Sequence, residues 1–113
     1  SYYVIYEPNP ITPQPPKPKP FNELEVKSYP NPTTDCFYID MKRDGTEVTN
    51  SPLKVQITDV NGRVIEQHDV STMDISDKIF GRHLPPGRYN IIMFDPTKLK
   101  NRNNYKLIQI QKL

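Results

Sequence analysis

The chain has 113 residues, of which 35% are hydrophobic and 25% charged, and its formal net charge is +2. This length allows one domain with a modest core. The sequence contains no apolar run near the roughly twenty residues that a membrane-spanning helix needs, and so small a charge does not indicate nucleic-acid binding. Its single cysteine excludes an internal disulfide. We therefore expect a small domain that neither binds nucleic acid nor inserts into a membrane.

The N-terminal segment differs in composition from the rest of the chain. Seven of the thirteen prolines fall between Pro8 and Pro20. Because proline fixes φ and lacks a backbone N–H, we predict an extended polyproline II spacer, with a ligand for an aromatic-lined groove as the alternative. The chain begins at Ser1 without a methionine, so we expect it to be part of a longer protein. Residues 1–22 are then the end of a preceding region and a linker, and residues 23–113 are the folded domain.

A short run with strong strand propensity comes before the linker. Aromatic and β-branched residues favour strands, so we expect this run to be the last strand of a preceding domain. Such a strand could pair with the edge of a neighbouring chain, and the oligomeric state is otherwise open. The run consists of Tyr2, Tyr3, Val4, Ile5 and Tyr6.

After the linker, apolar and polar residues alternate in short segments, which is typical of strands with one buried face. Leu24 and Val26 begin the first such strand, and residues 37–41 form the second. Residues 43–46 then predict a turn. The side chains that we expect to be largely buried in the whole domain are Leu24, Val26, Phe37, Ile39, Val55, Ile57, Tyr89, Ile91 and Ile108.

Residues 53–67 predict a β-hairpin, which is the clearest local signal in the chain. Leu53, Val55 and Ile57 alternate with polar residues, then Asp59-Val60-Asn61-Gly62 precedes a second apolar pair. Asn-Gly tolerates positive φ at both central positions of a two-residue turn, so we predict a type I′ turn.

The C-terminal half continues the strand pattern. Residues 73–76 predict a fifth strand and residues 77–82 one helical turn. Residues 88–94 are apolar on both faces, which favours a central strand, and residues 105–113 form the last strand. Six or seven short strands with turns between them predict an all-β fold, an immunoglobulin-like antiparallel β-sandwich.

Motifs that would indicate catalysis or cofactor binding are missing from the sequence. Cys36 precedes a strand, where a small residue is a simpler interpretation than a nucleophile, and His68 and His83 stand in no motif that would pair them with it. The turn at residues 59–62 lacks the glutamate that a calcium loop has at its twelfth position. We therefore predict no enzyme, no metal site and no cofactor.

Four short motifs follow one another after the linker. The Tyr-Pro-Asn-Pro motif follows a strand, the hairpin motif reads Asp-x-x-Gly-Arg, the Leu-Pro motif reads Leu-Pro-x-Gly-x-Tyr, and the terminal block is a strand with lysines. In this order they resemble the type A C-terminal sorting domain of the type IX secretion system, found on exported proteins of Bacteroidetes. The matching residues are Tyr29, Pro30, Asn31, Pro32, Asp59, Gly62, Arg63, Leu84, Pro85, Gly87, Tyr89 and residues 106–113. Residues 77–83 and 95–104 look like insertions relative to that pattern.

The resemblance implies that the domain is a secretion signal. In that family the outer-membrane translocon recognises the folded domain, and a cell-surface cysteine peptidase commonly removes it. The upstream cargo then reaches the cell surface or the medium by way of the periplasm. By this resemblance, cleavage is expected around Pro20, Phe21, Asn22 and Glu23, and translocon recognition at Lys106, Leu107, Ile108, Ile110, Lys112 and Leu113.

The last strand could serve recognition in a simple physical way. At a sheet edge it would offer unpaired backbone groups and exposed lysines to a receptor strand or an acidic groove. The lysines could instead be ordinary edge residues that prevent aggregation. The alternative function is an immunoglobulin-like accessory module that binds glycan or protein, or acts as a spacer. An accessory module would continue beyond Leu113, whereas a sorting domain would end the gene there.

Overall fold

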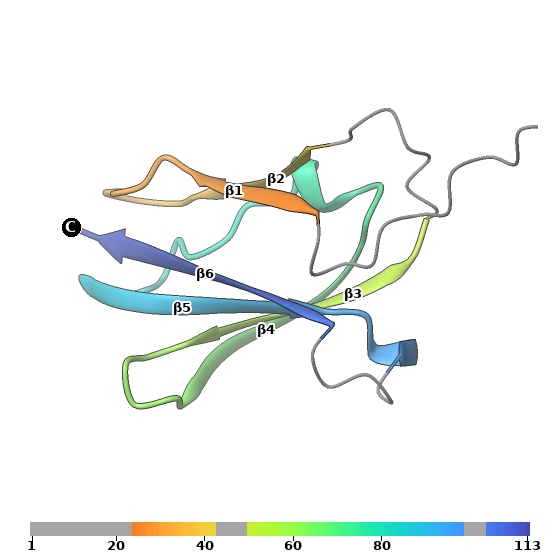
Figure 1. The fold of residues 1–113 in the computed structure, drawn as a ribbon. Helices are drawn as coiled ribbons and strands as arrows, with labels where there is room; N and C mark the ends of the chain where they lie inside the picture. The colour runs from red at the N-terminus through yellow and green to blue at the C-terminus, as the bar shows by residue number, and fades with distance from the viewer. Residues whose placement is uncertain (1–23, 43–49, 99–103) are drawn as a thin grey trace, which may run out of the picture.

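The computed structural model describes residues 24–42, 50–98 and 104–113. Strands β1 and β2 form one antiparallel sheet, which lies over a second antiparallel sheet of order β4-β3-β5-β6 (Figure 1). The predicted all-β sandwich is thereby confirmed, with six strands in the part of the chain that the structure describes. The elements are β1 (Glu25–Tyr29), β2 (Tyr38–Lys42), β3 (Pro52–Thr58), β4 (Val64–Ser71), η2 (Ile75–Asp77), β5 (Gly87–Phe94), η3 (Pro96–Lys98) and β6 (Tyr105–Lys112).

Several predictions concern residues that the structure does not describe. The β-prone run, the linker, the expected cleavage region and the predicted turn at residues 43–46 all lie outside the described residues. Within the described residues, no helix is long and apolar enough to cross a membrane.

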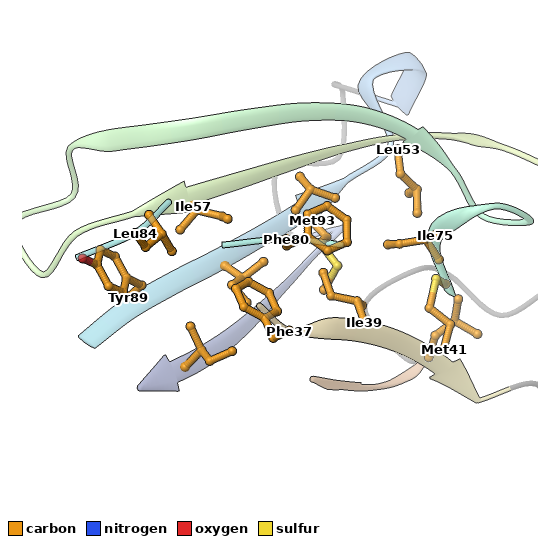
Figure 2. Packing of buried hydrophobic residues seen from close by; sticks show 14 residues of the cluster. Phe37, Ile39, Met41, Leu53, Ile57, Ile75, Phe80, Leu84, Tyr89 and Met93 are labelled. Carbon is orange, nitrogen blue, oxygen red and sulfur yellow. The ribbon is translucent and has the colours of Figure 1, made fainter. Parts of the chain in front are cut away.

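The core lies between the two sheets. Val55, Ile57 and Ile91 on the central strands β3 and β5 are fully buried, in one cluster with Phe37, which precedes β2, and Ile39 of β2. Figure 2 shows Ile57, Phe37 and Ile39 within this cluster. Alternation predicted these positions correctly because only one face of each strand meets the other sheet. The predicted core is confirmed except at two positions: Val26 and Ile108 are only partly buried, although both pack against the core.

The hairpin is confirmed, but the predicted type I′ turn is wrong. No residue other than glycine has positive φ in the described part of the chain, whereas Gly62 has φ of 83°. The loop is three residues long, with the Gly62 N–H donating to the Asp59 carbonyl at 3.1 Å and the Asp59 N–H donating to the Arg63 carbonyl at 3.0 Å. The Asp59 carboxylate also accepts the N–H groups of Asn61 and Arg63, both at 2.9 Å. This side chain therefore holds a turn in which only glycine needs the left-handed conformation.

The predictions for residues 73–82 were also wrong. The structure has no strand at residues 73–76; instead β4 extends to Ser71 and the helical turn of this region, η2, covers residues 75–77 in place of 77–82. Ile75 is buried in the core while Met73 is 44% exposed. One apolar side chain therefore packs into the core from a segment that lacks the alternating pattern of a strand. A single buried residue in a loop leaves no periodic signal.

Residues 77–83 carry a second core residue that the sequence pattern did not reveal. Phe80 is 1% exposed, its backbone pairs with that of Phe37 through two hydrogen bonds of 2.9 and 3.0 Å, and the two rings stack with centroids 5.9 Å apart. Gly81 follows with φ of 77°, and a Cβ at that position would lie 2.5 Å from the Phe37 ring. Phe80 thus anchors this segment to Phe37, just before β2 begins.

Candidate recognition surface

Strand β6 forms one edge of the four-stranded sheet, as expected for the terminal block. Ile110 and Lys112 point into the sandwich, and Ile108 packs against the core from the same face. Leu107 lies on the opposite face and is 52% exposed. The strand therefore contributes to the core with one face and to the surface with the other.

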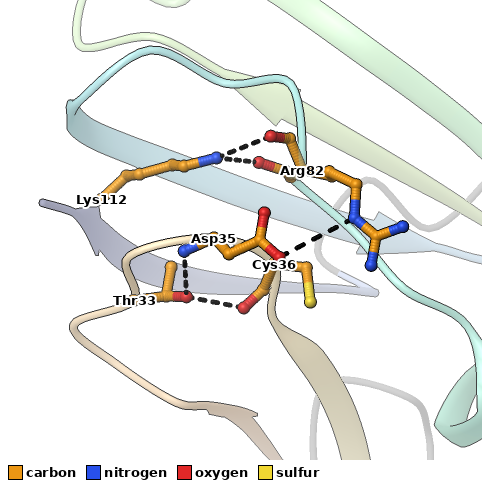
Figure 3. A network of polar contacts seen from close by, with 6 residues as sticks. Thr33, Asp35, Cys36, Arg82 and Lys112 are labelled. Carbon is orange, nitrogen blue, oxygen red and sulfur yellow. Dashed lines mark hydrogen bonds and ion pairs between the residues drawn. The ribbon is translucent and has the colours of Figure 1, made fainter.

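The burial of Lys112 contradicts the expectation of an exposed terminal lysine. Its side chain is 8% exposed, and Nζ donates to the Gly81 carbonyl at 2.6 Å and to the Arg82 carbonyl at 3.0 Å (Figure 3). The alternation of Ile108, Ile110 and Lys112 places all three on the inner face. Lys112 therefore joins the end of β6 to the insertion and is neither an exposed cation nor an edge gatekeeper.

The loop that carries the Tyr-Pro-Asn-Pro motif closes the outer edge of β6. The Asn31 amide donates to the Gln109 carbonyl at 3.0 Å and accepts the Gln111 N–H at 3.1 Å, across 78 and 80 residues of sequence. The Thr33 N–H donates to the Gln111 carbonyl at 2.9 Å, and the Leu113 N–H donates to the Thr33 carbonyl at 2.8 Å. In the C-terminal half of β6 the Gln109 carbonyl and both backbone groups of Gln111 are consequently paired, contrary to the expectation of a free edge.

Hydrogen bonds within the same loop also stabilise it. The Thr33 hydroxyl donates to the Cys36 carbonyl at 2.6 Å and accepts the Asp35 N–H at 3.3 Å (Figure 3). Thr33 is 2% exposed. Tyr29 and Tyr38 stack beside it with ring centroids 5.6 Å apart. These contacts hold the loop against the β6 edge.

The Leu-Pro motif shapes the start of β5. Leu84 is buried in the core, and the Tyr89 hydroxyl donates to the Pro85 carbonyl at 2.6 Å. Tyr89 pairs with Ile110 across β5 and β6, and Gly87 pairs with Lys112. The motif therefore supports the end of the terminal strand directly.

The motifs meet at an open hollow of about 470 Å³ beside this end of β6. Asn31 comes from the Tyr-Pro-Asn-Pro loop, Val60 from the hairpin turn, Arg88 and Tyr89 from the Leu-Pro motif, and the remainder from β5 and β6. The lining residues are Asn31, Val60, Arg88, Tyr89, Asn90, Gln109, Ile110 and Gln111. Only the folded chain brings these segments together.

The six residues expected at the translocon lie in different environments. Leu107 and Leu113 are exposed, Lys106 and Ile108 are half-buried, and Ile110 and Lys112 are buried. The polar lining residues Asn90, Gln109 and Gln111 were not predicted, because alternating polar residues on a strand look like any solvent-facing surface. Of the hairpin motif, Gly62 and Arg63 are exposed, and Asp59 is half-buried.

The residues considered for catalysis make contacts within the fold. Cys36 is half-buried at the start of β2, and its carbonyl accepts the Thr33 hydroxyl. His68 pairs with Glu66 at 3.0 Å and meets the edge of the Phe80 ring at a centroid distance of 5.2 Å. No group of three or more histidine, cysteine or acidic side chains that could hold a metal occurs within residues 24–42, 50–98 and 104–113.

Comparison with known proteins agrees with this arrangement. Residues 27–111 match the family described as the Secretion system C-terminal sorting domain. Neither the curated proteins nor the solved structures contain a significant match to the chain. The matched range includes the Tyr-Pro-Asn-Pro loop, the hairpin, the Leu-Pro motif and nearly all of β6. The chain therefore belongs to the family of secretion system C-terminal sorting domains, the sorting signals of type IX secretion.

Proposed function

We propose that residues 23–113 act as a cleavable sorting signal for an upstream cargo. Residues 1–22 are then the end of the cargo region and a linker. A type IX sorting domain directs export through the outer membrane to the cell surface or the medium, and it works with the secretion system. The family is one of sorting signals and not of enzymes. We accordingly propose that this domain has no catalytic activity of its own.

The observation that carries this proposal is the meeting of the sequence motifs around one end of β6. Asn31 bonds to the backbone of a strand about eighty residues later, and the Leu-Pro motif supports the same strand from its other side. A receptor that contacts this region would therefore bind a surface that only the folded domain presents. We propose that Leu107, Leu113 and Lys106 contribute to recognition directly, and that Ile108, Ile110 and Lys112 contribute by holding the strand in place.

We propose that the cell-surface cysteine peptidase separates domain and cargo near residues 20–23. Proline-rich segments cannot join the interior of a sheet, so a peptidase could reach this linker after export. Tyr2–Tyr6 would then stay with the cargo, where the run could pair with a neighbouring strand. Mass spectrometry of the exported cargo would test the cleavage, and an intact Leu113 end would count against it.

Export of a reporter tests the function as a whole. The 113-residue chain is fused to the C-terminus of an inert protein directed to the periplasm of a type IX secretor, with an unfused reporter as the control. We expect the fusion to appear at the cell surface or in the medium while the unfused reporter stays in the periplasm. Periplasmic retention of a folded, intact fusion would favour the accessory-module interpretation instead.

A further inference from the structure

We propose that the polar hollow beside the end of β6 is the docking surface for an acidic, extended segment of the secretion machinery, with Arg88 as its charged anchor. This inference rests on the proposed function, because it names the part of the domain that the machinery contacts. It replaces Lys112 as a source of charge recognition, since that side chain is buried and already bonded.

The charge of the hollow favours an anionic ligand. Among the described residues that line it, Arg88 is the only charged one and none carries a carboxylate. Arg88 is exposed and forms no ion pair with any described residue. The Asp59 carboxylate, one residue before Val60, accepts the Asn61 and Arg63 N–H groups through Oδ1 and forms no ion pair with Arg88. A guanidinium without a partner presents a planar fork that suits a carboxylate, which it can bind through two hydrogen bonds.

The remaining polar groups favour a peptide over a simple anion. The Asn90, Gln109 and Gln111 side chains line the hollow and make no hydrogen bond to another described residue, whereas the Asn31 amide is already used on β6. Each free amide offers both a donor and an acceptor, which can pair with peptide groups. One cation with three neutral amides matches a chain segment bearing an acidic side chain. A phosphate-rich ligand would be better matched by several cations.

The neighbouring edge of β6 also favours a polypeptide. The Gln109 carbonyl and both backbone groups of Gln111 point away from β5, because they bond to Asn31 and Thr33. The alternation of an antiparallel ladder turns the backbone groups of Leu107 and Tyr105 to the same side. No hydrogen bond joins these groups to another described residue. An extended segment could therefore pair with this edge and place an acidic side chain at Arg88.

A charge series at position 88 tests the inference in the export assay described above, using the full chain fused to the reporter. The variants are Arg88→Lys, Arg88→Gln and Arg88→Glu. Lys98→Glu is the control, since Lys98 is exposed in η3 beyond the opposite end of β5, roughly 20 Å away at about 3.4 Å per residue. Thermal unfolding of each purified chain establishes that it is folded.

We expect export to fall about tenfold for Arg88→Gln, to fall less for Arg88→Lys, which keeps the charge but loses the two-bond fork, and to fall further for Arg88→Glu, which repels the acidic partner. Lys98→Glu should be exported like the parent. If the parent is exported and folded Arg88→Glu is exported equally well, the docking surface is wrong and the sorting function stands. If Arg88→Gln and Arg88→Glu lose export equally, the partner is not acidic. If the parent itself is not exported, the proposed function fails first.

Binding to isolated membranes identifies the class of partner. The purified 113-residue chain is mixed with outer-membrane fragments of the type IX secretor, with both faces accessible. We expect binding that protease treatment of the fragments abolishes and that Arg88→Glu weakens about tenfold or more. Binding that survives complete proteolysis would mean an acidic glycan or lipid partner and would overturn the inference.

Discussion

Replacing Lys112 with methionine would remove the buried ammonium at the end of β6 while keeping an aliphatic stem in the same space. The ammonium donates to two carbonyls, and hydrogen bonds to a charged group contribute about 1.5–3 kcal/mol each. Burying the charge opposes that gain by several kcal/mol, so the two effects largely offset each other. The decisive difference between parent and variant is then what happens to the two carbonyls.

The surroundings of the two carbonyls differ. Arg82 is exposed, so water can replace the lysine there, but Gly81 is buried. The Gly81 carbonyl still accepts the Leu84 N–H at 3.1 Å and so loses one of its two partners, and we expect Lys112→Met to destabilise the chain by about 0.5–1.5 kcal/mol. In a domain of this size each kcal/mol lowers the melting temperature Tm by about 4–8 °C. Circular dichroism on heating measures the shift.

Lys78→Met is the matched control for this prediction. Lys78 is exposed, so the same chemical change there should alter the free energy of unfolding by less than about 0.5 kcal/mol. A Lys112→Met variant as stable as Lys78→Met would refute the structural role of Lys112. Replacing Lys106 and Lys112 together by glutamine would for this reason be a poor export test, because it would alter the fold together with the charge.

Four further substitutions test the fold. Ile57 is fully buried, so Ile57→Ala should cost about 2–5 kcal/mol in urea denaturation, and an unchanged midpoint would contradict its burial. Gly81→Ala combines positive φ with a clash against Phe37 and should cost roughly 2–5 kcal/mol, whereas Gly62→Ala has positive φ in open space and should cost about 1–2 kcal/mol; equal losses would exclude the clash. Asn31→Ala should cost about 1–2 kcal/mol and speed amide exchange at Gln111, and unchanged exchange would place the closing contact elsewhere.

The parts of the fold that could be predicted from sequence are those that repeat along a strand. Leu53, Val55 and Ile57 follow the two-residue period, and each is buried as predicted. Ile75 and Phe80 enter the core singly from loops, where no period exists to reveal them. The hairpin turn was misassigned because its geometry depends on a side chain, Asp59, and not on the Asn-Gly pair alone.

The surface was harder to predict than the core. The two-residue period of β6 was sufficient to place Lys112 on the inner face of the strand. Because lysine side chains are seldom buried, its charge nevertheless favoured the prediction of an exposed side chain. What holds it inside is a pair of carbonyls from the Gly81–Arg82 turn, and that contact exists only in the folded chain. The hollow is similarly invisible in sequence, because its amides and Arg88 come from polar positions that look ordinary on each strand.

The closure of the β6 edge links the stability of the domain to its recognition. An open edge strand offers unpaired backbone groups to any other chain and so promotes aggregation. In this domain Asn31 and Thr33 occupy those groups along the C-terminal half of β6. They can do so only after the first and last strands have come together across about eighty residues. A receptor that needs both the closed end of β6 and the neighbouring hollow would therefore bind a fully folded domain. It would not bind a domain whose terminal strand has not yet paired with the sheet.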